Sequence, residues 1–138
     1  MARMRPRFAD RGMRVIAGYL EAGSATVDAL LADARTLARE RLPGGARCAL
    51  SQLERRLDRH LRLDERVLMP MLEEQGGSRR EVASLRREHQ RLRALVDEAG
   101  AVVERRDPKT FLQTTRVLGE RLTRHHRRER RILDALEA

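Results

Sequence analysis

Two pairs of histidine and carboxylate residues carry the strongest chemical signal in this sequence. His60 precedes Asp64 by four residues, and His125 precedes Glu129 by the same spacing. On a helix this spacing places both members of a pair on one face, one turn apart. Together with His89 they form a set of imidazoles and carboxylates, which suits Fe, Mn or Zn, whereas Ca and Mg prefer oxygen ligands alone. These five residues are the predicted metal ligands.

Both pairs interrupt apolar seams in which hydrophobic residues recur at alternating steps of four and three, as on a buried helix face. A buried polar group without a partner costs at least about 1–3 kcal/mol, and a charge costs more. The seam residues must therefore pair with other polar groups or hold a metal. The apolar members are Leu50, Leu53, Leu57, Val67 and Met71 around the first pair, and Phe111, Leu118, Leu122, Ile132 and Leu136 around the second.

A constant register shift, which carries position 60 onto position 125, superposes one pair on the other. The same shift relates the segments that precede them, which indicates an internally duplicated helical hairpin. Under this shift His89 falls on Ser24, so the first segment has no inward histidine. The matched residues of the preceding segments include Leu20 with Leu85, Val27 with Leu92, Leu30 with Leu95, Asp33 with Glu98 and Ala34 with Ala99.

Four helices are predicted to position the candidate ligands. The first follows an irregular lead-in over residues 1–11, in which Phe8 could dock onto the bundle, and it ends near Arg41. Its inward residues are Ile16, Leu20, Val27, Leu31 and Ala34. Pro43, Gly44 and Gly45 make the next turn, so the second helix should begin near Ala46.

The remaining boundaries come from turn and capping signals. Pro70 should kink or end the regular part of the second helix. Ser78 is the expected N-cap of the third helix and Asp107, followed by Pro108, that of the fourth. Short connectors make sequential helices antiparallel. The predicted fold class is all-α, an up-down-up-down antiparallel four-helix bundle.

Length and composition are consistent with one domain over residues 1–138. Hydrophobic residues make up 41% of the chain and aromatic residues only 2%, so the core should consist of Leu, Ala and Val. The net charge of +9 comes almost wholly from arginine, because Lys109 is the only lysine, a bias that suggests a GC-rich bacterial genome. An acidic protein partner could bind this surface, whereas three aromatic residues cannot build a stacking platform for nucleic acid.

The sequence also bears on the compartment. Cys48 is the only cysteine, so an intrachain disulfide is impossible and a reducing compartment is expected. The N-terminal residues lack the apolar core of a signal peptide, and no run of about 18 apolar residues is present. A cytoplasmic protein without a membrane span is predicted, and its oligomeric state stays open.

Three segments resemble the hemerythrin-like, or HHE cation-binding, family: residues 60–70 (HLRLDERVLMP), the Glu88-His89 pair and residues 125–129 (HHRRE). The resemblance covers the chain from the first helix onward. It implies an up-down four-helix bundle around a non-heme di-iron centre. It further implies that the three histidines are terminal ligands and that Asp64 and Glu129 bridge the irons. Activities in the family include reversible O2 binding, peroxide breakdown, iron or oxygen sensing and repair of damaged iron centres.

The sequence departs from that family at two ligand positions. Ser24 stands where a first-helix histidine is expected, and Leu85 and Arg93 flank His89 where hemerythrins carry a second third-helix histidine. Three outcomes follow: two irons with open coordination positions, one metal held by two histidines and a carboxylate, or a polar core that has lost its metal. The small residues around position 24 fit either a space for substrate or simple loss.

Other polar residues near these positions are weaker candidates. Four residues near the absent ligands could in principle replace them: Tyr19, Glu21, Glu65 and His126. Each of them fits a surface or packing role better than direct ligation. His126 follows His125 directly and should point about 100° away, toward the rim. The leading prediction is a non-heme iron protein that binds or reacts with O2 or peroxide, whether or not it is an enzyme. The alternative is a metal-free helical interaction or regulatory module.

Overall fold

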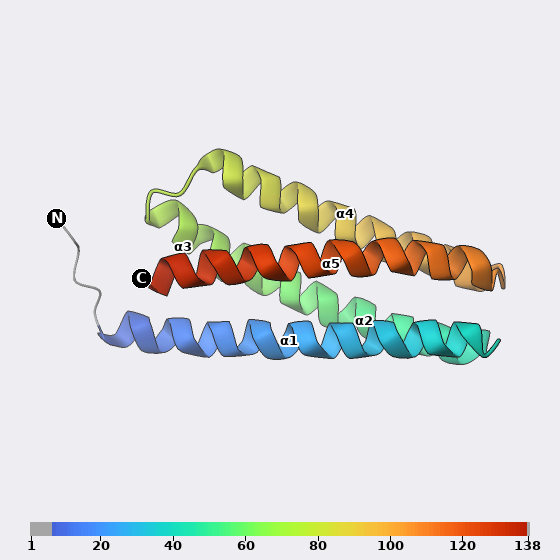
Figure 1. The fold of residues 1–138 in the computed structure, drawn as a ribbon. Helices are drawn as coiled ribbons and strands as arrows, with labels where there is room; N and C mark the ends of the chain where they lie inside the picture. The colour runs from blue at the N-terminus through green and yellow to red at the C-terminus, as the bar shows by residue number, and fades with distance from the viewer. Residues whose placement is uncertain (1–6, 138) are drawn as a thin grey trace.

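The computed structural model describes the backbone of residues 7–137 and the side chains of residues 12–137. Every regular element in this part of the chain is helical, which confirms the predicted all-α class (Figure 1). The elements α2, η1 and α3 follow one another without a loop, so the chain forms four helical rods. The elements are α1 (Arg7–Arg39), α2 (Pro43–Leu63), the π-helical turn η1 (Asp64–Leu68), α3 (Met69–Glu74), α4 (Arg79–Glu104) and α5 (Pro108–Glu137).

The rods pack side by side as a helical bundle. Both α1 and α4 contact α2 and α5, and α3 contacts α4. The first turn of α1 and the last turn of α5 lie at the same end of the bundle (Figure 1). Segment Gly12–Arg39 of α1 is long and apolar enough to cross a membrane, a test that core helices of soluble proteins also pass. The absence of a membrane span therefore stays a prediction.

The first two helices begin earlier than predicted. α1 begins at Arg7, so residues 7–11 are helical rather than an irregular lead-in, and the docking predicted for Phe8 lies outside the described side chains. α2 begins at Pro43, so Gly44 and Gly45 belong to its first turn rather than to the connector. Proline suits this position because its missing N–H would have no partner in the first turn of a helix.

The capping signals correctly located the starts of α4 and α5. The Ser78 hydroxyl accepts a hydrogen bond from the backbone N–H of Arg80 at 3.1 Å. A carboxylate oxygen of Asp107 accepts one from the backbone N–H of Thr110, also at 3.1 Å, and Pro108 is the first residue of α5. Both side chains satisfy donors that the first turn of a helix leaves free.

The π-helical turn changes which residues face the core after Asp64. Leu68 and Met69 are buried there, whereas the predicted Val67 and Met71 are only half-buried. Pro70 has no backbone N–H, and the regular α-helix ends at Leu63, upstream of the proline. A π turn contains one residue more than an α turn, so the buried face moves one position along the chain.

The core consists of two apolar clusters with the predicted ligands between them. One cluster contains Leu57 of α2 and Leu122 of α5, just before the two histidine and carboxylate pairs. The other contains Leu68 and Ile132, just after them. The polar side chains therefore occupy a single layer across the bundle, and apolar packing closes that layer on both sides.

Candidate metal centre

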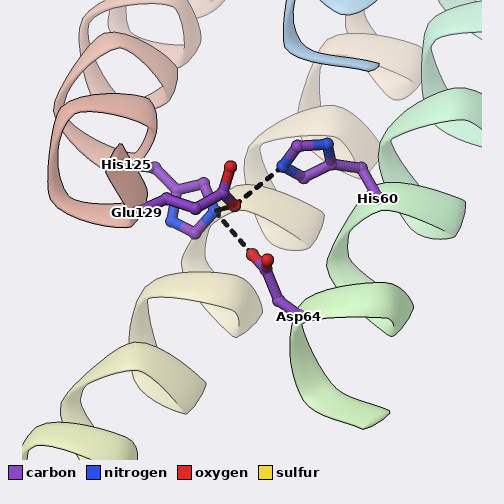
Figure 2. Close-up of side chains that lie close together, drawn as sticks. All are labelled: His60, Asp64, His125 and Glu129. Carbon is purple, nitrogen blue, oxygen red and sulfur yellow. Dashed lines mark hydrogen bonds and ion pairs between the residues drawn. The ribbon is translucent and has the colours of Figure 1, made fainter. Parts of the chain in front are cut away.

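Four of the predicted ligands meet inside the bundle. His60 lies in the last turn of α2 and Asp64 is the first residue of η1, while His125 and Glu129 lie on α5. Each offers one ligand atom, and these four atoms lie within 4.8 Å of one another (Figure 2). All four residues are buried, with exposed fractions of 5% or less. The arrangement has the size and the donor types of a metal site.

The histidines and carboxylates of the site contact one another between α5 and the continuous α2–η1 segment. His60 Nε2 lies 2.9 Å from Glu129 Oε2, and His125 Nε2 lies 3.1 Å from Asp64 Oδ2. His125 Nε2 is also 3.3 Å from Glu129 Oε2. Each histidine thus faces the carboxylate of the other helix, and the Nε2 atoms point at the same small volume (Figure 2).

His89 approaches the same cluster from α4. Its side chain is fully buried, its Nε2 lies 3.4 Å from Asp64 Oδ2, and its ring centroid is 5.0 Å from that of His125. This contact lacks the alignment of a hydrogen bond, so His89 Nε2 is buried without a partner. The other carboxylate oxygen of Asp64, Oδ1, is also buried without a partner. Two orphaned ligand atoms in one layer are costly. A cation between them would satisfy both, so the residues fit a metal.

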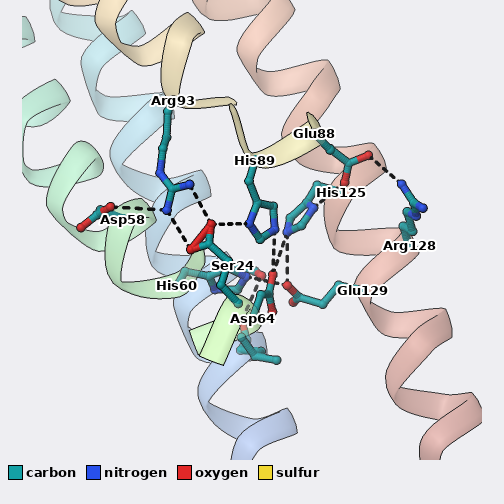
Figure 3. A network of polar contacts seen from close by, with 12 residues as sticks. Ser24, Asp58, His60, Asp64, Glu88, His89, Arg93, His125, Arg128 and Glu129 are labelled. Carbon is teal, nitrogen blue, oxygen red and sulfur yellow. Dashed lines mark hydrogen bonds and ion pairs between the residues drawn. The ribbon is translucent and has the colours of Figure 1, made fainter. Parts of the chain in front are cut away.

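Two further acidic residues, which are not predicted ligands, contact the outer nitrogen of two of the histidines. Glu88 points at His125 from the neighbouring helix (Figure 3), and His125 Nδ1 lies 2.5 Å from Glu88 Oε1. His89 Nδ1 lies 3.2 Å from Glu65 Oε1. Arginines hold these acids in turn. Arg93 donates to Glu65 at 2.8 Å and 3.1 Å, and Arg128 donates to Glu88 at 3.4 Å. Such partners fix the ring orientation and tautomer of ligating histidines.

The contacts shift the pKa values of the buried groups in opposite directions. Burial alone lowers the pKa of His125, but the neighbouring carboxylates of Asp64, Glu129 and Glu88 raise it to about 11. Burial would raise the pKa of Asp64, but the hydrogen bond from His125 and the contact with His89 hold it below its ordinary value. His125 and Asp64 therefore form an ion pair. A cation that binds His125 must displace a proton.

Helix α1 contributes no described histidine or carboxylate to the cluster. The Ser24 hydroxyl donates to the backbone oxygen of Leu20 at 2.9 Å, within its own helix. Of the possible substitutes, Tyr19 is 70% exposed and Glu21 pairs with Arg130 at 3.6 Å on the surface. The fourth wall of the site is thus a stretch of helix with small side chains.

His126 is more enclosed than predicted. Its side chain is 16% exposed, and its ring lies 5.7 Å from that of His60 between centroids. Its Nε2 is buried without a hydrogen-bond partner, and burial lowers its pKa to about 4, so the ring is neutral. With Ser24 and Glu129 it lines a cavity of about 350 Å³ between α1 and α5. The cavity therefore reaches Glu129, a predicted ligand, from the side of α1, the helix that contributes no predicted ligand.

The outer partners were not predicted in their actual roles. The sequence suggests Glu65 only as a substitute ligand and Glu88 only as part of a motif. The available signal was that each acid adjoins a predicted ligand, Asp64 or His89, and that ligating histidines usually donate their second N–H to a carboxylate or another acceptor. Which histidine each acid contacts depends on how the helices pack, and the spacing within one helix does not contain that information.

Comparison with known proteins agrees with this geometry. The profile of the hemerythrin HHE cation-binding domain matches residues 19–136, a range that includes all five predicted ligands. Curated proteins and solved structures give no match. The matched range spans most of the chain. The chain therefore belongs to the hemerythrin HHE cation-binding domain family.

Proposed function

We propose that this protein binds non-heme iron, with two ions favoured, and that the centre binds or reacts with O2 or peroxide. The residues that would hold the ions are His60, Asp64, His89, His125 and Glu129. One observation carries the proposal: four ligand atoms from α2, η1 and α5 converge within 4.8 Å in a buried layer. The orphaned atoms of Asp64 and His89 support it.

The donor set favours a transition metal. Three imidazoles and two carboxylates suit Fe, Mn or Zn, while Ca and Mg favour oxygen ligands. Iron is chosen because the sequence resembles hemerythrins, and a single iron held by two histidines and a carboxylate is the mononuclear version. Once bound, iron supplies redox chemistry toward O2 or peroxide. The chain holds the ions, keeps bulk water out with its two apolar clusters, and admits a small molecule through the cavity beside Ser24.

Anaerobic reconstitution with Fe(II), followed by air, tests this proposal. We expect close to two irons per chain and the absorption of an oxo-bridged di-iron centre, and about one iron for the mononuclear version. The variant H60A/H125A should lose iron and its metal-dependent rise in Tm, because a ligand of the native state stabilises by mass action. H126A removes a neighbouring imidazole outside the ligand set and should keep both. No uptake by the parent protein would contradict the proposal.

The second candidate is a metal-free helical interaction or regulatory module. Two direct contacts between side chains favour it, because His60 pairs with Glu129 and His125 with Asp64. This candidate predicts that added metal leaves the Tm unchanged. It also predicts that H60A/H125A folds and melts like the parent protein, with or without metal.

We also propose that the bundle has up-down-up-down topology and arose by duplication of a helical hairpin. The constant register shift supports this history, because it superposes two elements of the same site. The π turn occurs only in the first copy within the described chain, next to Pro70, whose counterpart in the second copy is Ala135. A cytoplasmic location and an acidic protein partner remain predictions from composition.

A further inference from the structure

The three buried histidines differ in what contacts their outer nitrogen. Nδ1 of His125 meets Glu88 and Nδ1 of His89 meets Glu65. Nδ1 of His60 has no hydrogen-bond partner among the described residues. It faces Gly23 of α1, where an added Cβ atom would lie only 2.9 Å from it. One of the three candidate ligands thus lacks the outer acceptor that the others have.

The duplicated sequence shows which residue would be expected to contact His60 Nδ1. The shift that carries His60 onto His125 also carries Gly23 onto Glu88. In one half of the bundle Glu88 of α4 supports His125 of α5. In the other half Gly23 of α1 lies against His60 of α2 and supplies no side chain. The carboxylate present in one half has no counterpart in the other.

An arginine-lined groove opens at this point. His60 and Gly23 line a groove of about 630 Å³ between α1 and the α2–η1 segment, and its described lining residues include no acidic side chain. Four arginines line it: Arg56, Arg59, Arg62 and Arg66. Arg62 pairs with Asp58 at 2.8 Å, whereas the other three form no ion pair in the described part of the chain. The groove therefore concentrates uncompensated positive charge beside the unsupported imidazole.

We propose that this groove binds a small oxyanion, a carboxylate or a phosphate-like group, which accepts a hydrogen bond from His60 Nδ1. The anion takes the place that the Glu88 carboxylate occupies beside His125, and the free arginines balance its charge. The inference rests on the proposed function, because Nδ1 carries the hydrogen once Nε2 binds a cation. Metal and anion then strengthen each other's binding by the same factor.

Metal affinity measured with sulfate as the probe tests the groove. Zn(II) affinity is determined by competition with a chelator, in sulfate and in chloride at matched ionic strength. We expect sulfate to tighten Zn(II) binding on the order of 10-fold, as for other outer partners of metal ligands. The variant R59Q/R66Q should lose this effect. R79Q/R86Q removes the same charge from exposed positions on α4 outside the groove, and it should keep the effect.

A spectroscopic readout locates the anion. In the Zn(II)-loaded, 15N-labelled protein, sulfate should shift the Nδ1–H resonance of His60 and leave that of His125 in place. Equal Zn(II) affinity in sulfate and chloride would overturn the anion site while leaving the metal site intact. So would an effect that persists in R59Q/R66Q, because sulfate would then act on the metal itself. Failure to bind Zn(II) in both buffers would instead remove the metal centre on which the inference rests.

Discussion

At the scale of single residues, the site depends on how each imidazole ring is held. Glu88 and Glu65 fix two of the rings through their Nδ1 atoms. The third, that of His60, is held by its contact with Glu129 and by its fit against the backbone of Gly23. The absence of a side chain at position 23 is therefore a structural requirement of the site.

Replacing Gly23 should damage metal binding. In Gly23→Ala the added Cβ would lie 2.9 Å from His60 Nδ1, so the ring must move away from the other ligands. We expect Zn(II) affinity to fall on the order of 10-fold, within the range for disturbed outer positions. Gly18→Ala is the matched control, because an added Cβ there meets nothing within 4 Å. Chelator competition measures both, and equal affinities would contradict this view of Gly23.

Glu88 should contribute to metal affinity without touching the metal. Glu88→Gln removes the charge that faces His125 Nδ1 and weakens its hold on the ring. We expect Zn(II) affinity to fall on the order of 10–100-fold. Glu98→Gln makes the same change at an exposed position on α4 and should leave the affinity unchanged. If the two variants bind Zn(II) alike, Glu88 has no orienting role.

The metal-free protein should lose stability as the pH rises. His125 has a pKa near 6.5 in the unfolded chain and a pKa of about 11 in the fold. Between these values the folded state binds more protons, so the free energy of unfolding falls with increasing pH, and the contribution is complete only below about 6.5. Urea unfolding of chelator-treated protein between about pH 6 and pH 9.5 measures the slope. A parent slope no steeper than that of His125→Gln would count against these ion pairs.

At the scale of helices, local signals predicted the starts of α4 and α5, but not the π turn. Ser78 and Asp107 act through their own backbone neighbours, so sequence alone contains the necessary information. The π turn depends on how the helix accommodates Pro70 while keeping both Asp64 and Leu68 in the core. The neighbouring helices take part in this arrangement, and the spacing within one helix does not describe them. The strict four-three spacing therefore predicted wrongly that Val67 is a core residue.

The cap of α4 offers a test at this scale. Ser78→Ala removes the acceptor for the backbone N–H of Arg80, and we expect a loss of about 1 kcal/mol in the free energy of unfolding. Ser51→Ala, at an exposed position inside α2, should be neutral or slightly stabilising because alanine favours helix interiors. Urea denaturation compares the two. Equal effects would show that the hydroxyl of Ser78 does not cap the helix.

At the scale of the whole molecule, the fold places one polar layer between two apolar clusters. The constant register shift predicted which side chains share that layer, because two copies of one hairpin must align their seams. It could not predict that α1 leaves openings on both sides of position 23. Those openings depend on the packing of small residues against α2 and α5.

Anomalous diffraction at the iron edge, from crystals of the reconstituted protein, tests the central claim most directly. The account predicts one or two strong peaks in the buried layer, bounded by His60, Asp64, His125 and Glu129, with His89 in contact. Peaks confined to the protein surface, or no peak in a protein whose side chains keep the contacts described above, would contradict it.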